Sequence, residues 1–127
     1  NFGNKQNFIN FVKAMRLTQK AILLKIKHKN KGNIKLCKAI DEFIATVEEK
    51  NWKNREELLS DRPDADQVHN DGFYFFNINI HRTLVLIEMG LDGEATIVWA
   101  GTHDDYERIF KNSKDSIRKY LRDKGWI

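Results

Sequence analysis

The sequence contains one cysteine, one proline and no long apolar run. Cys37 has no partner for an internal disulfide, and we interpret it as a small buried helix residue of a protein kept in a reducing compartment. No apolar run approaches the roughly 18 residues that a membrane span requires, and no signal-peptide pattern is visible. We therefore expect no membrane partner and a cytoplasmic location.

Acidic residues are missing from the first 40 positions, which hold ten lysines and arginines. Residues 41–72 reverse this balance, with ten acidic against four basic residues. Such asymmetry favours a polyanionic partner, above all nucleic acid, although a solvated helix face with scattered lysines has the same composition. The candidate residues for binding RNA or the ribosome are Lys20, Lys25, Lys27, Lys29, Lys31 and Lys35.

The 127 residues are predicted to form a single domain, residues 1–127, with enough chain to bury a core. Residues 1–14 lack periodicity, and we expect a flexible segment or an incomplete N-terminus there. Thr18 is the predicted N-cap of a first helix, which Gly32 ends. A second helix is predicted from an apolar stripe at helical spacing, formed by Leu36, Ile40, Phe43, Ile44 and Val47. The two helices are expected to form an antiparallel hairpin.

Three strands are predicted after a polar connector, residues 51–71, which contains one helical turn. The first strand covers residues 73–80, with its even positions on the apolar face, and the next two cover residues 83–89 and 95–100. Short turns between them favour an antiparallel meander.

Helix is expected again after Thr102 and near Ser113, so that residues 111–127 form a C-terminal helical extension. The predicted fold class is α+β: an N-terminal helical hairpin packed on a small antiparallel β-sheet, with a C-terminal helix.

The sequence Gly101-Thr102-His103-Asp104-Asp105-Tyr106 places two proton-transfer groups at the end of the last strand. Arg82 lies inside the preceding apolar strand, where an unpaired guanidinium is costly. Cleavage of RNA needs a base, a cation for the phosphate and an acid for the leaving oxygen. Arg82 can bind phosphate, His103 can serve as base or acid, and Tyr106 can relay a proton or offer its ring for stacking.

His81 and Asn77 are additional candidates for this site. The four histidines lack metal-ligand spacing and the lone cysteine has no partner, so neither a metal nor a cofactor is expected.

Structural interpretations of the same residues stay open. Thr102 is also a good helix N-cap, with the following aspartates favoured by the helix dipole. Arg82 could pair with Glu88 or Asp71 as a structural arginine. His69 and His81 lie at strand or turn margins, where surface histidines are common.

The segments Tyr74-Phe75-Phe76-Asn77-Ile78, Arg82-Thr83-Leu84 and Gly101 to Glu107 resemble the HigB toxin family of type II toxin–antitoxin systems, within the RelE/ParE-like superfamily. The resemblance covers roughly Met15 to Phe110. It implies a RelE/ParE-like fold and a bacterial mRNA interferase that cuts mRNA on the ribosome. By position, Arg82, His103 and Tyr106 match the family's strand arginine and closing-motif histidine and tyrosine.

The resemblance further implies a reaction without metal, in which the 2′-hydroxyl attacks and leaves a 2′,3′-cyclic phosphate or a 3′-phosphate. It implies a cognate antitoxin, commonly a HigA-like helix-turn-helix protein, so that DNA is contacted only through the antitoxin complex. The chain departs from the family in lacking any lysine between Asn54 and Phe110 and in the extension after Phe110. The alternatives are a non-catalytic toxin of the same fold that acts on gyrase, or an RNA-binding module.

Overall fold

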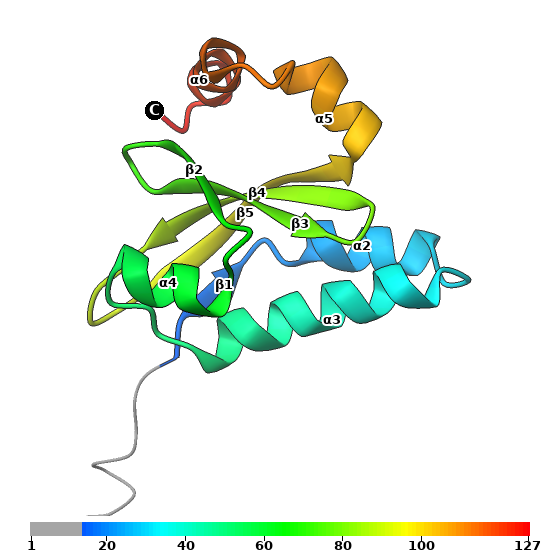
Figure 1. Ribbon diagram of the computed structural model, residues 1–127, viewed down its shortest axis with the longest axis horizontal. Helices are drawn as coiled ribbons and strands as arrows, with labels where there is room; N and C mark the ends of the chain where they lie inside the picture. Colours follow the sequence, from blue (N-terminus) through cyan, green and yellow to red (C-terminus); the bar gives the residue numbers. More distant parts are fainter. Residues whose placement is uncertain (1–13) are drawn as a thin grey trace, which may run out of the picture.

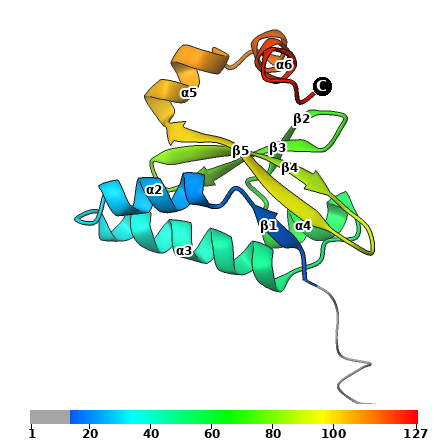
Figure 2. The same cartoon turned by 180° about the vertical axis from the view of Figure 1, so that it is seen from behind.

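The structure, a computed structural model, describes residues 14–127 as a five-stranded sheet with helices on both of its faces (Figures 1 and 2). Of the predicted N-terminal segment, residues 1–14, only residue 14 lies within the described part. The strands are β1 (Arg16–Thr18), β2 (Asp66–His69), β3 (Phe73–Ile78), β4 (His81–Glu88) and β5 (Glu94–Thr102). The helices are α2 (Ala21–Lys29), α3 (Ile34–Glu49), α4 (Arg55–Asp61), α5 (His103–Phe110) and α6 (Lys114–Asp123).

The strand order in the sheet is β1-β5-β4-β3-β2. Strands β2 to β5 are antiparallel neighbours, as predicted for the three strands from Phe73 onward, but β1 runs parallel to β5. The prediction of an antiparallel sheet is therefore wrong at this edge. A three-residue strand is too short to show alternation, and its pairing with β5 is not a property of the local sequence.

Helices α2, α3 and α4 lie on one face of the sheet and α5 and α6 on the other (Figures 1 and 2). Each face has its own apolar core. Beneath the first face, Phe43 and Phe76 meet edge to face with ring centroids 5.1 Å apart. Beneath the second, Phe75 and Phe110 do the same at 5.2 Å. Alternate residues of β3 therefore pack into two different cores, and for this reason the strand is apolar on both sides.

Helix α3 has the buried stripe that its spacing predicts, and Asn33 caps it by accepting a hydrogen bond from the Leu36 amide at 3.1 Å. Helix α2 differs from the prediction, because it begins at Ala21 and Thr18 does not cap it. The Thr18 hydroxyl instead donates to Thr96 Oγ1 at 2.8 Å and ties β1 to β5. Thr18 therefore does not cap α2, because its hydroxyl bonds to β5, a strand far along the chain.

Strand β3 ends two residues earlier than predicted, at Ile78. Asn79 has a φ of 55°, which turns the chain into β4, and Ile80 is 58% exposed at the turn. The prediction that Ile80 extends the apolar face is therefore wrong. Within residues 14–127, no helix is both long enough and apolar enough to cross a lipid bilayer.

Candidate active site

Arg82 lies on the central strand β4, between Asn77 of β3 and Gly101 of β5. Its Nε donates a hydrogen bond to Asn77 Oδ1 at 3.1 Å. Among residues 14–127 it forms no ion pair, so the alternative that Arg82 pairs with Glu88 or Asp71 is wrong. Arg82 is half-buried as a residue, and its terminal nitrogens make no hydrogen bond to a described residue, so they remain available as a pair of donors.

The aromatic rings of Tyr106 and Phe75 stabilise this cation. The guanidinium carbon of Arg82 lies 4.3 Å from the centroid of the Tyr106 ring and 5.7 Å from that of Phe75. A cation over a ring face is attracted by the ring quadrupole, which offsets part of the cost of removing the charge from water. Arg82 is thus held without neutralisation by a carboxylate.

Tyr106 is 2% exposed and is fixed at both ends. Its ring meets Phe75 edge to face at 4.9 Å and tilts against Phe110 at 5.7 Å. Its hydroxyl donates to Asn112 Oδ1 at 3.0 Å, in the turn after α5. The ring therefore faces Arg82, whereas the hydroxyl is engaged elsewhere.

His103 is the first residue of α5, and its side chain is 63% exposed. Its ring is stacked on Tyr106, with centroids 5.9 Å apart and planes inclined by 24°. Nε2 lies 3.5 Å from Glu107 Oε1. Tyr106 therefore links the other two predicted site residues, because both Arg82 and His103 lie against its ring.

The start of α5 is capped as predicted. Thr102 Oγ1 accepts a hydrogen bond from the Asp105 amide at 3.0 Å. Hydrogen bonds from Arg108 and Thr102 hold the pKa of the Asp105 carboxyl below its ordinary value. The same helix start is therefore both a well-formed cap and one wall of the site.

His81 is buried beneath this helix start, so its interpretation as a surface histidine is wrong. It pairs with Thr102 in the sheet and is 8% exposed. Its Nδ1 is buried and has no hydrogen-bond partner among the residues that the structure describes. Burial lowers the pKa of His81 below 6.5, and the nearby charge of Asp105 offsets this only in part. His81 is thus a neutral imidazole at pH 7.

Asn77 lies opposite Arg82 in the β3–β4 ladder, and its main chain is held by two residues that the sequence analysis missed. Its amide donates to Asp64 Oδ2 at 2.8 Å, and its carbonyl accepts from Arg62 Nη2 at 2.7 Å. The signal in the sequence was the only proline, Pro63, which lies between these two oppositely charged residues.

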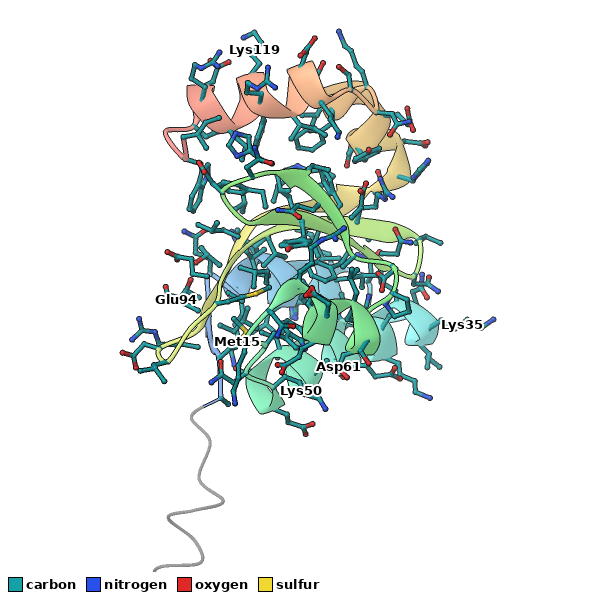
Figure 3. The ribbon with its side chains drawn as sticks, turned by 60° about the vertical axis from the view of Figure 1, so that its left-hand side comes forward. Met15, Lys35, Lys50, Asp61, Glu94 and Lys119 are labelled. Carbon is teal, nitrogen blue, oxygen red and sulfur yellow. The ribbon has the colours of Figure 1, made fainter. Side chains whose placement is uncertain are left out.

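The candidate basic residues lie on α2 and at its N-cap, in the loop after it and at the start of α3, on the sheet face opposite α5 (Figure 1). Two of them are engaged by acidic residues of α3: Lys20 lies 2.9 Å from Glu48 and Lys27 lies 2.7 Å from Asp41. Lys35 points away from the body of the protein (Figure 3). Within residues 14–127, ion pairs are absent from Lys25, Lys29, Lys31 and Lys35.

No group of three or more His, Cys, Asp or Glu side chains in the described part of the chain is placed to hold a metal ion. What the described site offers is one positioned cation, one exposed imidazole, one buried neutral imidazole and an aromatic platform. Arg82 on the central strand and the histidine and tyrosine at the start of α5 are the residues that the resemblance to the RelE-like HigB toxin family implies for its site.

Comparison with known families agrees with this class. Residues 37–109 match the HigB toxin family, described as the RelE-like toxic component of a toxin–antitoxin system. The chain belongs to the HigB toxin family. The matched segment runs from α3 to α5 and includes Arg82, His103 and Tyr106, whereas Lys20 to Lys35 and α6 lie outside it. No curated protein matches the chain.

Proposed function

We propose that this toxin is a ribosome-dependent, metal-independent endoribonuclease that cleaves mRNA in the cytoplasm and so stops translation. The observation that carries the proposal is Arg82: a half-buried residue whose guanidinium lies over Tyr106, free of any carboxylate among the described residues, while the exposed His103 stacks on the same tyrosine ring. A guanidinium in such a setting is well placed to bind a phosphate through two parallel hydrogen bonds.

In the proposed reaction the 2′-oxygen bonds to phosphorus while the bond between phosphorus and the 5′-oxygen breaks. His103 takes the proton of the 2′-hydroxyl, and the departing 5′-oxygen takes up a proton from water. The product is a 2′,3′-cyclic phosphate, which hydrolysis converts into a 3′-phosphate. Arg82 stabilises the charge that builds up on the phosphate oxygens.

Tyr106 has the role of a platform in this scheme, because its hydroxyl already donates to Asn112. His81, neutral and buried under Thr102, supports the start of α5 that carries His103. The exposed lysines of α2 and the following loop contribute attraction to ribosomal RNA from the opposite face of the sheet.

As a toxic component of a toxin–antitoxin system, the chain has an antitoxin as its natural partner. We propose a HigA-like helix-turn-helix antitoxin, which neutralises the toxin and contacts the DNA of their operon.

The test is cleavage of a defined mRNA in a reconstituted translation system, with the RNA ends mapped. Arg82→Ala is expected to lower the cleavage rate by about 10²- to 10³-fold, as the loss of a preorganised charge-stabilising group does elsewhere. His103→Ala should lower it by about 10²-fold or more. Arg122→Ala, which removes an exposed arginine from α6, is the matched control and should cleave like the wild type.

Growth of bacteria that express each variant provides a second readout. Growth arrest with intact transcripts would overturn the nuclease proposal and favour a toxin that blocks gyrase or another target by binding. RNA binding without growth arrest would favour an RNA-binding module. Wild-type cleavage by Arg82→Ala would refute the assignment of the site.

A further inference from the structure

The main chain of β3 continues beyond its partner strand, and a pair of side chains takes that partner's place. In the β2–β3 ladder Asp66 is opposite Phe75. The next residue of β3 whose backbone groups point to the same side is Asn77, and its partner on β2 would be residue 64. Strand β2 does not reach residue 64. At this position Asp64 Oδ2 accepts from the Asn77 amide at 2.8 Å, and Arg62 Nη2 donates to the Asn77 carbonyl at 2.7 Å.

The two side chains are also joined to each other, because Arg62 Nη2 lies 2.8 Å from Asp64 Oδ2. Together with the Asn77 amide and carbonyl they reproduce the paired hydrogen bonds that a neighbouring antiparallel strand would make. We call Arg62 and Asp64 the strand clamp. Pro63 between them fixes one backbone angle and keeps the chain out of helix, so that both side chains reach the same residue of β3.

The strand clamp is anchored in the core on the α3 face. The Arg62 guanidinium lies 5.4 Å from the centroid of Phe43 and 5.8 Å from that of Phe76. Its side chain is 21% exposed, and its Nε is buried without a hydrogen-bond partner among the described residues. Burying a guanidinium with an unsatisfied nitrogen costs free energy, whereas an apolar side chain could fill the same space without that cost.

Asn77 transmits the position of the strand clamp to the other face of the sheet. Both of its backbone groups point toward the strand clamp, so Asn77 and Arg82 form a non-hydrogen-bonded pair, in which facing side chains lie closest. The Asn77 carboxamide oxygen accepts from Arg82 Nε at 3.1 Å. With Nε held by Asn77 and the guanidinium plane held over Tyr106, the orientation of the two terminal nitrogens is fixed.

We propose that Arg62 and Asp64 are positioning residues for Arg82, acting through Asn77. The proposal rests on the proposed function of Arg82 in binding phosphate. Arg62 contacts the rings of the α3 face and Arg82 those of the α5 face, so the strand clamp influences the site through the strand between them. Loss of the strand clamp lets Asn77 shift and leaves Arg82 free to rotate about its side-chain bonds.

The first experiment measures kcat and KM for mRNA cleavage in the Arg62→Met variant. A misplaced catalytic group lowers kcat by about 10- to 100-fold, whereas KM stays within about threefold because most RNA contacts lie elsewhere. Arg16→Met is the matched control: Arg16 also pairs with a carboxylate, 2.7 Å from Glu94, at the opposite edge of the sheet. Its kcat and KM should equal those of the wild type.

A double-mutant cycle separates positioning from general loosening of the fold. If Arg62 acts through Asn77, the Arg62→Met/Asn77→Ala double variant has the same kcat as Asn77→Ala alone. Losses in kcat that multiply would overturn the proposal. Asp64→Asn keeps an oxygen for the Asn77 amide and removes the charge that holds Arg62, so its kcat should fall between wild type and Arg62→Met.

A readout that does not depend on nuclease activity completes the test. The Arg82 Nε–H signal in nitrogen-edited NMR should exchange with water at least fivefold faster in Arg62→Met than in the wild type or Arg16→Met, while a folded amide spectrum is retained. Unchanged exchange would refute the strand clamp. Absence of cleavage by the wild type, with exchange altered as expected, would instead refute the proposed function and leave the positioning of Arg82 standing.

Discussion

Replacing Tyr106 by phenylalanine distinguishes a ring that supports Arg82 from a hydroxyl that moves a proton. The substitution leaves the ring in place, 4.3 Å beneath the guanidinium carbon and 4.9 Å from Phe75. A phenyl ring has the same sign of quadrupole, so the attraction to the cation persists. If the proposed platform role is correct, kcat for mRNA cleavage stays within about threefold of the wild type.

The cost of Tyr106→Phe should appear in stability instead. The hydrogen bond of the hydroxyl in the described structure is the 3.0 Å bond to Asn112, an exposed residue whose carboxamide can turn to water. The expected loss in the free energy of unfolding is therefore about 0.5–1.5 kcal/mol, the range for one neutral hydrogen bond. Urea denaturation of both proteins at pH 7 measures it.

Asn112→Gly is the matched control, since it removes the same hydrogen bond and leaves the phenol intact. Glycine suits the φ of 48° at this position, so the backbone is not strained by the change. Both variants should cleave at near wild-type rates. A fall in kcat of about 10²-fold or more in Tyr106→Phe, with Asn112→Gly unaffected, would mean that the hydroxyl acts as a general acid or base and would refute the platform role.

Three further predictions concern stability and RNA binding. Gly72→Ala should destabilise the protein by more than about 2 kcal/mol in urea, because the new Cβ would lie 2.6 Å from a β4 carbonyl oxygen at a φ of 98°; Gly90→Ala, with a φ of 139° and open space, should lose less. Because the pKa of His81 is lowered, its contribution to stability is present above pH 6.5 and is lost as the pH falls below it. The wild type should therefore lose stability relative to His81→Gln below pH 6.5, whereas the difference between the two should stay constant above it. Removing the charges of Lys29 at the end of α2 and Lys31 in the loop after it should lower the slope of log affinity for RNA against log salt by about one per lysine. An unchanged slope would exclude this part of the chain from the RNA interface.

The elements that the sequence predicted well are those whose signal is local. The α3 stripe, the strands that begin at Phe73 and end near Ala100, and the Thr102 cap all follow from spacing within a few residues. Strands β1 and β2 escaped prediction because they have three and four residues and gain their structure from partners elsewhere in the sheet. The same reason explains Thr18, whose hydroxyl serves β5 rather than the helix that follows it.

For the site, the sequence indicated which residues converge but not how they are held. Arg82 and His103 both lie against the Tyr106 ring, on the strand and at the helix start that the sequence singled out. The Arg62–Asn77 contact could not be anticipated, because it depends on where β2 begins. The ion pairs of Lys20 and Lys27 likewise depend on how α2 lies along α3.

The parallel pairing of β1 with β5 also imposes an order on folding. Arg16 stands opposite Glu94, so the first described strand cannot enter the sheet until the chain beyond residue 94 is available. Strands β2, β3 and β4 are neighbours both in sequence and in space, and they can pair earlier with small loop-closure cost. During synthesis on a ribosome β1 must therefore wait for β5. Because β5 leads directly into the helix that carries His103 and Tyr106, the sheet closes and the site gains its last residues in the same late stretch of chain.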